Sequence, residues 1–412
     1  MGFVYPDGII ATSGHVDHGK TTVVYALSGV WVARHSEEVK KAMTIKLGYT
    51  QIGIYDCGGE YPLTDGLLSE GKCPDGSEPK LLRKISIVDV PGHEVLIATM
   101  VSGAAAVDAA VMVIDATMPV PQPQTAEHFA VLDIIGVRNM VVAQNKVDLV
   151  TREKALENYS QIKKFLAGTW AEDAPVVPVS ALHKVNIDAL AAYIAKITPR
   201  RAPDISKPAR MAVLRSFNIN PPGTPVEKLR GGVLGGTLLQ GTIRIGDEVE
   251  IRPGLKLDRP GARAPYQPLY TKVVGIEYGG ERAEEARPGG LVGLLTTLDP
   301  ALAKADALAG SIVGKPGSLP PVWTTIELEV KELPRLGEKA EPLKQNEVVM
   351  ASVGPATVFG VVQSAKRDTA AIALKKAVAA EEGAKVVLTR QVKNRWVVTN
   401  YGILRGGNAV LE

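Results

Sequence analysis

The chain has 412 residues, of which 45% are apolar and 22% are charged, with a formal net charge of +3. These fractions are ordinary for globular proteins, and the length predicts two or three domains. No apolar run approaches the roughly 20 residues that cross a bilayer, and residues 1–7 do not resemble a signal peptide, which excludes an obvious membrane or secreted protein. The two cysteines are too few for a disulfide framework, which fits the cytoplasmic location that we expect.

A glycine-bounded loop follows the first predicted strand. The apolar residues 9–11 lead into residues 14–21, GHVDHGKT, which fit the pattern G-x-x-x-x-G-K-[ST]. Backbone N–H groups of such a loop can surround an anion, and a helix beginning near Lys20 points its positive end to the same place. Lys20 then supplies charge to the β- and γ-phosphates, and Thr21 is placed to bind Mg²⁺. The alternative is a glycine-rich turn with a solvent-facing lysine.

A second predicted strand, residues 83–89, ends in an aspartate and a turn. The sequence from Asp89 to His93 is DVPGH. An aspartate at a strand end can hold Mg²⁺ through water, and Gly92 can offer a backbone N–H to a γ-phosphate. This segment therefore supports a nucleotide site.

Two later strands lead to residues suited to guanine. Residues 140–144 precede an Asn-Lys-Val-Asp run that ends at Asp148, whose carboxylate can accept both guanine donors, N1–H and the exocyclic amine. Adenine cannot donate both bonds, so Asp148 favours GTP over ATP. Residues 176–179 lead to a Ser-Ala-Leu run whose backbone can meet guanine O6. The residues that we expect to contact GTP are Gly14, Asp17, His18, Gly19, Lys20, Thr21, Thr22, Gly92, Asn145, Lys146, Val147, Asp148, Ser180, Ala181 and Leu182.

The predicted elements divide the chain into an α/β part and two β-rich parts. Strands alternate with helices at 124–135, 153–166 and 187–197, which predicts a doubly wound, mostly parallel sheet within a GTP-binding domain of residues 1–200. A proline-rich linker at 198–208 leads to short, glycine-punctuated strands, which suggest a small β-barrel over 208–316. After a second break near 314–321, strands at 323–330, 347–353, 358–364 and 396–399 form a third domain over 320–412.

The whole chain resembles the translational GTPases, which include elongation factor Tu. Residues 43–49, 121–125, 136–139 and 215–220 are similar to the gamma subunits of archaeal translation initiation factor 2 within that class. The 45 positions between Thr44 and Asp89 leave room for an insert, at about 50–80, like that of the gamma subunits. This resemblance implies two β-barrels after the GTPase domain. It also implies GTP-dependent delivery of initiator methionyl-tRNA to the small ribosomal subunit, as the core of a heterotrimer with alpha and beta subunits, with GTP hydrolysis as the release switch.

The same resemblance assigns the switch residues. Thr44 matches the threonine that binds Mg²⁺ and senses the γ-phosphate, and His93 matches the residue that orients the attacking water, so His93 is the expected catalytic residue. Asp17 and the carbonyl of Ala42, where the family commonly has glycine, match a further cation contact. The expected magnesium residues are Thr21, Thr44, Asp17, Ala42 and, through water, Asp89, and the expected cofactors are GTP or GDP and Mg²⁺.

Charge and resemblance together indicate a tRNA surface. Residues 1–200 carry 18 Lys and Arg against 22 Asp and Glu, a net of −4, whereas residues 201–412 carry 29 against 22, a net of +7. A surplus of this size fits ordinary solvated surface as well as a nucleic-acid face. The family resemblance implies that Tyr49, Arg287, Gly289 and Gly290 contact the aminoacylated tRNA end, with Tyr49 stacking on the terminal adenosine or, alternatively, lying half-buried in the core.

The insert departs from the family pattern. Relatives commonly carry two Cys-x-x-Cys pairs that hold zinc, whereas this chain has single cysteines, Cys57 and Cys73, 16 positions apart. Two thiolates are half of a structural zinc site, and Asp56 or Asp75 would be poor substitutes for the missing Cys or His ligands. We therefore expect that zinc is absent and that a glycine-rich loop remains.

Three other functions stay open from the sequence. A sister carrier for elongator or selenocysteinyl-tRNA would have a shorter switch insert or an extra C-terminal domain. A sulfate-activating GTPase subunit would bind a sulfurylase partner and no tRNA. A GTP-binding scaffold without useful turnover is disfavoured by His93. No membrane partner is expected.

Overall fold

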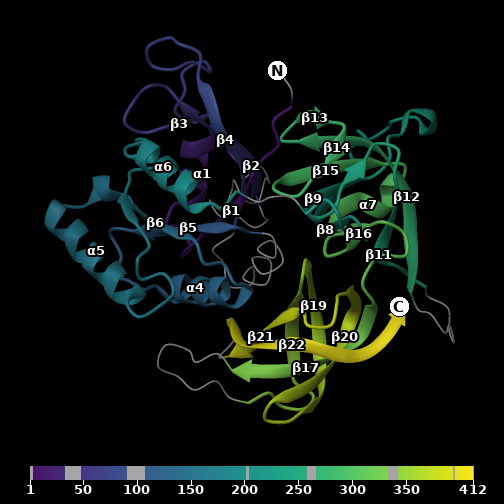
Figure 1. The fold of residues 1–412 in the computed structure, drawn as a ribbon. Coiled ribbons are helices and arrows are strands. Elements are labelled where there is room, and N and C mark those ends of the chain that lie inside the picture. The colour runs from purple at the N-terminus through teal and green to yellow at the C-terminus, as the bar shows by residue number, and fades with distance from the viewer. Residues whose placement is uncertain are drawn as a thin grey trace. The chain divides into compact units, whose positions relative to one another are not determined.

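The structure is a computed structural model that describes residues 3–32, 48–90, 107–200, 204–257, 266–332, 342–392 and 395–411. The chain divides into two compact units, residues 2–201 and residues 202–412, here called the N-terminal and C-terminal units (Figure 1). The sequence expectations for Ala42, Thr44, Gly92 and His93 lie outside the described residues. Among the described residues, no helix is long and apolar enough to cross a membrane.

The described part of the N-terminal unit contains a seven-stranded sheet in the order β3-β2-β4-β1-β5-β6-β7. Strands β4, β1, β5, β6 and β7 run parallel, whereas β2 pairs antiparallel with β4 and β3 antiparallel with β2. The strands are β1 (Ile9–Ser13), β2 (Gly48–Asp56), β3 (Leu63–Thr64), β4 (Lys80–Asp89), β5 (Ala109–Asp115), β6 (Met140–Asn145) and β7 (Val176–Pro178). The helices are α1 (Lys20–Ser28), α4 (Pro123–Ile135), α5 (Arg152–Leu166) and α6 (Ile187–Ile197), with a short 3-10 turn at Val147–Leu149.

Helices cover both faces of this sheet, with α1 and α6 on one face and α4 and α5 on the other (Figure 1). Every residue of β5 is buried, as the continuous apolar run of a central parallel strand predicts. Val23 and Leu27 of α1 pack with Leu190 and Ile194 of α6 in one hydrophobic cluster on the strands. The three helices predicted from the sequence are confirmed, and each observed boundary lies within one residue of the prediction.

The C-terminal unit contains two closed antiparallel sheets. In the first, the order β11-β16-β8-β9-β15-β12 closes through pairing of β11 with β12, and β13 adds to β12. The second is a closed barrel in the order β17-β20-β19-β18-β21-β22. The strands of the first part are β8 (Arg210–Phe217), β9 (Val233–Gln240), β10 (Ile243–Arg244), β11 (Glu248–Lys256), β12 (Tyr266–Tyr278), β13 (Glu281–Ala283), β14 (Glu285–Ala286), β15 (Leu291–Thr296) and β16 (Ile312–Gly314), with helix α7 (Pro300–Ala303). Those of the second are β17 (Val322–Glu332), β18 (Val348–Val353), β19 (Ala356–Ala365), β20 (Thr369–Ala379), β21 (Lys385–Val392) and β22 (Arg395–Leu411).

A buried ion pair holds the segment between the two barrels. Arg252 Nε donates to Glu250 Oε1 at 2.6 Å, and Arg252 Nη1 donates to the carbonyls of Leu319 and Pro320 at 3.2 and 3.1 Å. Glu250 Oε2 accepts from the backbone N–H of Gly317 at 2.7 Å. Because the two charges neutralise each other and their remaining hydrogen-bonding capacity is used on the backbone, they can be buried in the first barrel.

Candidate GTP and magnesium site

The predicted phosphate loop joins β1 to α1. Gly14 and Gly19 have φ of 127° and 89°, and a Cβ on Gly14 would collide with the carbonyl of Val113. Glycine is therefore required at Gly14 both for conformation and for space. Lys20, the first residue of α1, donates from Nζ to the carbonyls of Gly14 at 3.0 Å and His15 at 2.6 Å. The loop thus surrounds the ammonium group that we expect to meet phosphate oxygens.

Two side chains of α4 accept hydrogen bonds from the backbone of the phosphate loop. His128 Nδ1 accepts from the backbone N–H of Gly14 at 3.0 Å, and Gln124 Oε1 accepts from the backbone N–H of Val16 at 3.1 Å. His128 is completely buried. This support was not predicted from the sequence, where residues 121–125 served only as a sign of family resemblance. The polar residues on an otherwise apolar buried face of the helix were a signal for it.

Burial sets the protonation of the groups around the loop. It lowers the pKa of His128 to about 3 and that of His18 to about 4, so both imidazoles are neutral at physiological pH. A neutral His128 can present a lone pair on Nδ1, as its bond to the Gly14 N–H requires. Burial also lowers the pKa of Lys20 to about 8, against the opposing attraction of Asp89 and Asp17.

Two of the residues expected to hold magnesium, Thr21 and Asp89, meet at the end of β4. Asp89 is fully buried and accepts from the Thr21 hydroxyl at 2.6 Å through Oδ2 and from the Thr12 hydroxyl at 2.8 Å through Oδ1. The Thr12 hydroxyl in turn accepts from the backbone N–H of Val90 at 2.9 Å. A carboxylate beside a hydroxyl is a set of hard oxygen donors, which suits Mg²⁺. Thr12, which the sequence analysis missed, fixes the orientation of that carboxylate.

Asn145 connects the phosphate loop to the predicted guanine loop. Its Nδ2 donates to the carbonyl of His18 at 3.0 Å, and its Oδ1 accepts from the backbone N–H of Ala181 at 3.0 Å. One side chain therefore holds together two segments that are more than 160 positions apart in the sequence.

Lys146 and Asp148 complete this edge of the sheet. Lys146 Nζ lies 2.7 Å from Asp115 Oδ2. Burial alone would raise the pKa of Asp115, but hydrogen bonds from Lys146 and Thr117 outweigh it and lower the pKa. Asp148 lies in the 3-10 turn, 3.7 Å from Nε2 of the exposed His183. Asp148 therefore lies close to His183, which follows the Ser-Ala-Leu run, and Asp115 is a further buried carboxylate at this edge that was not predicted from the sequence.

The expected tRNA residues are divided between the two units, with Tyr49 in the N-terminal unit and the others in the C-terminal unit. Tyr49 lies in β2 opposite Val88 and is half-buried. Arg287 forms an ion pair with Glu285, and its backbone N–H and carbonyl both bind the hydroxyl of Tyr278. Gly289 has φ of 120°, which favours glycine.

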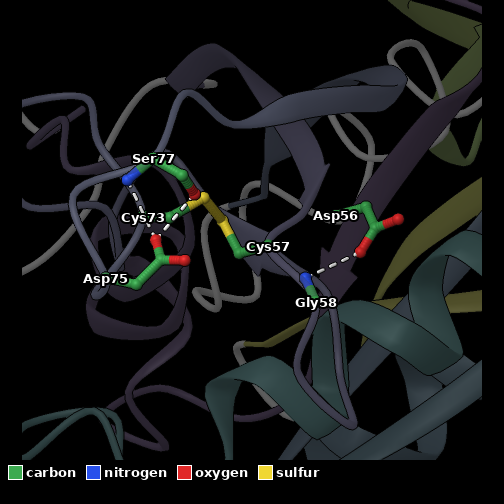
Figure 2. Close-up of a disulfide and its surroundings, with 6 residues drawn as sticks. All are labelled: Asp56, Cys57, Gly58, Cys73, Asp75 and Ser77. Atoms are coloured by element: carbon green, nitrogen blue, oxygen red, sulfur yellow. Dashed lines mark hydrogen bonds between the residues drawn. A yellow bond between two sulfur atoms is a disulfide. The ribbon is translucent and has the colours of Figure 1, made fainter.

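The insert contains a disulfide that the sequence analysis did not expect. It treated Cys57 and Cys73 as two thiolates, but the structure joins them in a disulfide with their Cα atoms 5.6 Å apart (Figure 2). The reason is the path of the chain, because the segment after β2 folds back through β3 and returns Cys73 to the end of β2. Asp56 and Asp75 bind nearby backbone instead, accepting from the N–H groups of Gly58 and Ser77 at 2.9 Å each.

Comparisons with known proteins agree with this arrangement. The family described as "Elongation factor Tu GTP binding domain" matches residues 8–200, and "Initiation factor eIF2 gamma, C terminal" matches residues 324–404. The chain is similar to "Translation initiation factor 2 subunit gamma" of Pyrococcus furiosus, with 48% identity covering 96% of this chain and 97% of the relative. It is also similar to the protein of that name from Methanothermobacter thermautotrophicus, with 50% identity covering 96% and 98%.

Solved structures show the same fold. The bacterial selenocysteine-specific elongation factor EF-Sec gives a TM-score of 0.72 at 23% identity, over 97% of this chain and 58% of that chain. Elongation factor SelB from Methanococcus maripaludis, in complex with the GTP analogue GPPNHP, gives 0.72 at 22% identity, over 99% and 80%. The sequence relatives favour the gamma-subunit family over the sister carriers and the sulfate-activating subunit. This chain belongs to the gamma-subunit family of translation initiation factor 2 and is a translational GTPase.

Proposed function

We propose that this GTPase binds GTP and Mg²⁺ at the carboxyl ends of β1, β4 and β6 and uses the nucleotide to control delivery of initiator methionyl-tRNA to the small ribosomal subunit. It acts in the cytoplasm as the core of a heterotrimer with alpha and beta subunits. The observation that carries the nucleotide part is the Asn145 side chain, which bonds the phosphate loop on one side and the Ala181 N–H on the other.

The described residues divide the recognition of GTP between phosphate and base. Lys20 and the backbone N–H groups of the loop bind the β- and γ-phosphates, and Asp148 accepts the two guanine donors while Ala181 and its neighbours face O6. Thr21 and Asp89, directly and through water, would hold Mg²⁺, which neutralises developing phosphate charge when it is bound. Neutral His128 and Gln124 keep the loop in shape.

The switch and tRNA roles extend this proposal to residues chosen from the sequence. Thr44 reports the γ-phosphate, and His93 orients the attacking water. Asp17 and the Ala42 carbonyl contact a further cation. Tyr49 stacks on the terminal adenosine, and Arg287, Gly289 and Gly290 also contact the aminoacylated tRNA end.

Paired tRNA titrations test the proposed switch. The heterotrimer should bind methionyl-tRNA roughly 5- to 150-fold better with a non-hydrolysable GTP analogue than with GDP, because coupling between sites is typically about 1–3 kcal/mol. Thr44→Ala should remove most of this difference with little change in GDP affinity, whereas His93→Ala should keep the difference and lose turnover. Equal tRNA affinity in both nucleotide states of the wild type would contradict the switch and favour a scaffold.

A further inference from the structure

The loop proposed to face guanine O6 is tied to the insert by Lys184. Residues 180–185 form a closed loop, because Ser180 and Val185 exchange backbone hydrogen bonds at 3.2 and 3.0 Å. Lys184 has φ of 56°, and its Nζ donates to the carbonyl of Gly66 at 2.6 Å. The same ammonium group lies 6.0 Å from the ring centroid of Tyr25 on α1. This loop therefore has an anchor outside the nucleotide site.

Gly66 also contacts the helix that begins at the phosphate loop. Its backbone N–H donates to the carbonyl of Leu27 at 2.9 Å, near the end of α1. A Cβ on Gly66 would collide with the carbonyl of Ala26, so only glycine lets the insert backbone approach this closely. Gly66 thus bonds both to the C-terminal end of α1 and to Lys184 of the loop proposed to face guanine.

The disulfide closes the segment that carries Gly66. Cys57 and Cys73 are 16 positions apart and bracket it (Figure 2). Within that segment, Asp65 accepts from the backbone N–H of Gly53 at 2.5 Å and from the Tyr55 hydroxyl at 2.8 Å. A cross-link of this length removes much of the conformational freedom that the open segment would have. The disulfide and Asp65 therefore restrict where the Gly66 carbonyl can lie.

We propose that Lys184 is a positioning residue for guanine recognition. We also propose that the insert holds Lys184 in place through the Gly66 carbonyl, and that the disulfide makes this support, here called the brace, sensitive to reduction. This inference rests on the proposed GTP site. A dithiol reductant would deliver two electrons and two protons, so that the sulfur–sulfur bond breaks, two thiols form, and the reductant becomes a disulfide. Cys57 is half-buried and Cys73 is only 3% exposed, so attack occurs at the Cys57 sulfur. The reduced insert holds Gly66 less firmly and weakens guanine binding.

Lys184→Met tests the positioning role. We expect GDP affinity to fall about three- to tenfold, the usual effect of losing one hydrogen bond. The affinity for 2-aminopurine riboside diphosphate, which lacks O6, should stay the same, because the loop contact is already missing there. Lys154→Met on α5 is the matched control and should change neither. Unchanged GDP affinity in Lys184→Met, or an equal loss for both nucleotides, would overturn the role.

Reversible reduction of the wild-type chain tests the brace. Mass spectrometry after thiol alkylation first establishes the fraction of oxidised protein. Treatment with dithiothreitol should weaken GDP binding in the wild type, have little further effect in Lys184→Met, and be reversed by reoxidation. Cys57→Ser/Cys73→Ser should match the reduced wild type. Equal GDP affinity before and after complete reduction would overturn the brace.

The same titrations distinguish a failure of the proposed GTP site from a failure of the proposed role of Lys184. A wild-type chain that binds GDP no better than ADP would overturn the proposed function and the inference together. A wild-type chain that discriminates GDP from ADP, with no loss of discrimination in Lys184→Met, would overturn the inference alone.

Discussion

The charged groups of the proposed phosphate and magnesium site have different partners from the ion pairs of the C-terminal unit. In the N-terminal unit, Lys20 donates to backbone carbonyls and Asp89 accepts from hydroxyls, at the carboxyl ends of neighbouring strands. In the C-terminal unit, the buried Arg252 and Arg390 form close ion pairs with Glu250 and Glu347, both at 2.6 Å. Burying a charge is costly unless a partner compensates it.

This difference fits a charged ligand at the proposed nucleotide site. Carbonyls and hydroxyls hold Lys20 and Asp89 in place, and Asp89 and Asp17 attract the Lys20 ammonium group. Phosphate oxygens and magnesium are the partners that we propose for these two groups. The pairs of the C-terminal unit are already neutralised, so their role is structural.

Breaking the Arg252–Glu250 pair should give the largest effect. Arg252→Met leaves Glu250 as an uncompensated buried charge, which we expect to destabilise the C-terminal unit by about 3–5 kcal/mol. GDP affinity should not change. Calorimetric unfolding and hydrogen exchange in β11 measure the first effect, and titration calorimetry measures the second.

An exposed pair provides the control for that experiment. Arg405 lies 2.6 Å from Glu329, but their side chains are 59% and 41% exposed. Arg405→Met should therefore cost at most about 1 kcal/mol. Equal destabilisation by the two substitutions would show that burial does not distinguish these pairs.

Mild acid should destabilise the N-terminal unit through His18 and His128. Their folded pKa values of about 4 and 3 lie below the ordinary 6.5. As the pH falls below 6.5, the unfolded chain takes up protons that the folded chain excludes, so stability is complete above pH 6.5 and is lost toward pH 4. At pH 5 the expected loss is about 2 kcal/mol for each histidine.

Hydrogen exchange of α4 at pH 7.5 and pH 5 measures this loss. His128→Gln removes one titrating group and should reduce the acid sensitivity by about half, whereas His183→Gln, at a side chain that is 61% exposed, should not. If all three proteins lose the same stability between the two pH values, the buried histidines are not responsible.

The last expected effect concerns recognition of the base. Asp148→Asn replaces an acceptor with a donor, so GTP should bind more weakly by roughly 1–3 kcal/mol, while xanthosine triphosphate, which has an acceptor at that position, should gain. Competition between GTP and xanthosine triphosphate measures the change. An unaltered preference for GTP would show that Asp148 does not contact the base. The evidence for a nucleotide site would then rest on the phosphate loop alone.

The sequence was sufficient where a residue's role follows from local chain geometry. Gly14, Gly19 and Lys20 belong to one short loop, and Asp89 and Asp148 follow apolar strands whose carboxyl ends meet at one edge of a parallel sheet. The observed helices and strands confirm this part of the prediction. The roles of these residues toward GTP and Mg²⁺ stay predictions.

Contacts between distant segments could not be predicted in the same way. His128 meets Gly14 across 114 positions, and Lys184 meets Gly66 across 118, with no local pattern that pairs them. The Cys57–Cys73 disulfide depends on how the insert folds back after β2. Asp115 could have been predicted from the sequence, because it ends a buried apolar strand as Asp89 does.

The short outer strands of the seven-stranded sheet of the N-terminal unit affect how readily the protein aggregates at high concentration. Its edges are β3, with two residues, and β7, with three residues that end in Pro178, which has no N–H to donate. An exposed edge strand is a template for pairing with another chain, and a short or proline-ended one is a poor template. In the C-terminal unit, the sheet closed by β11 and β12 and the barrel of β17 to β22 are closed rings of strands. Strands β3 and β7 are thus poor templates for pairing with another chain.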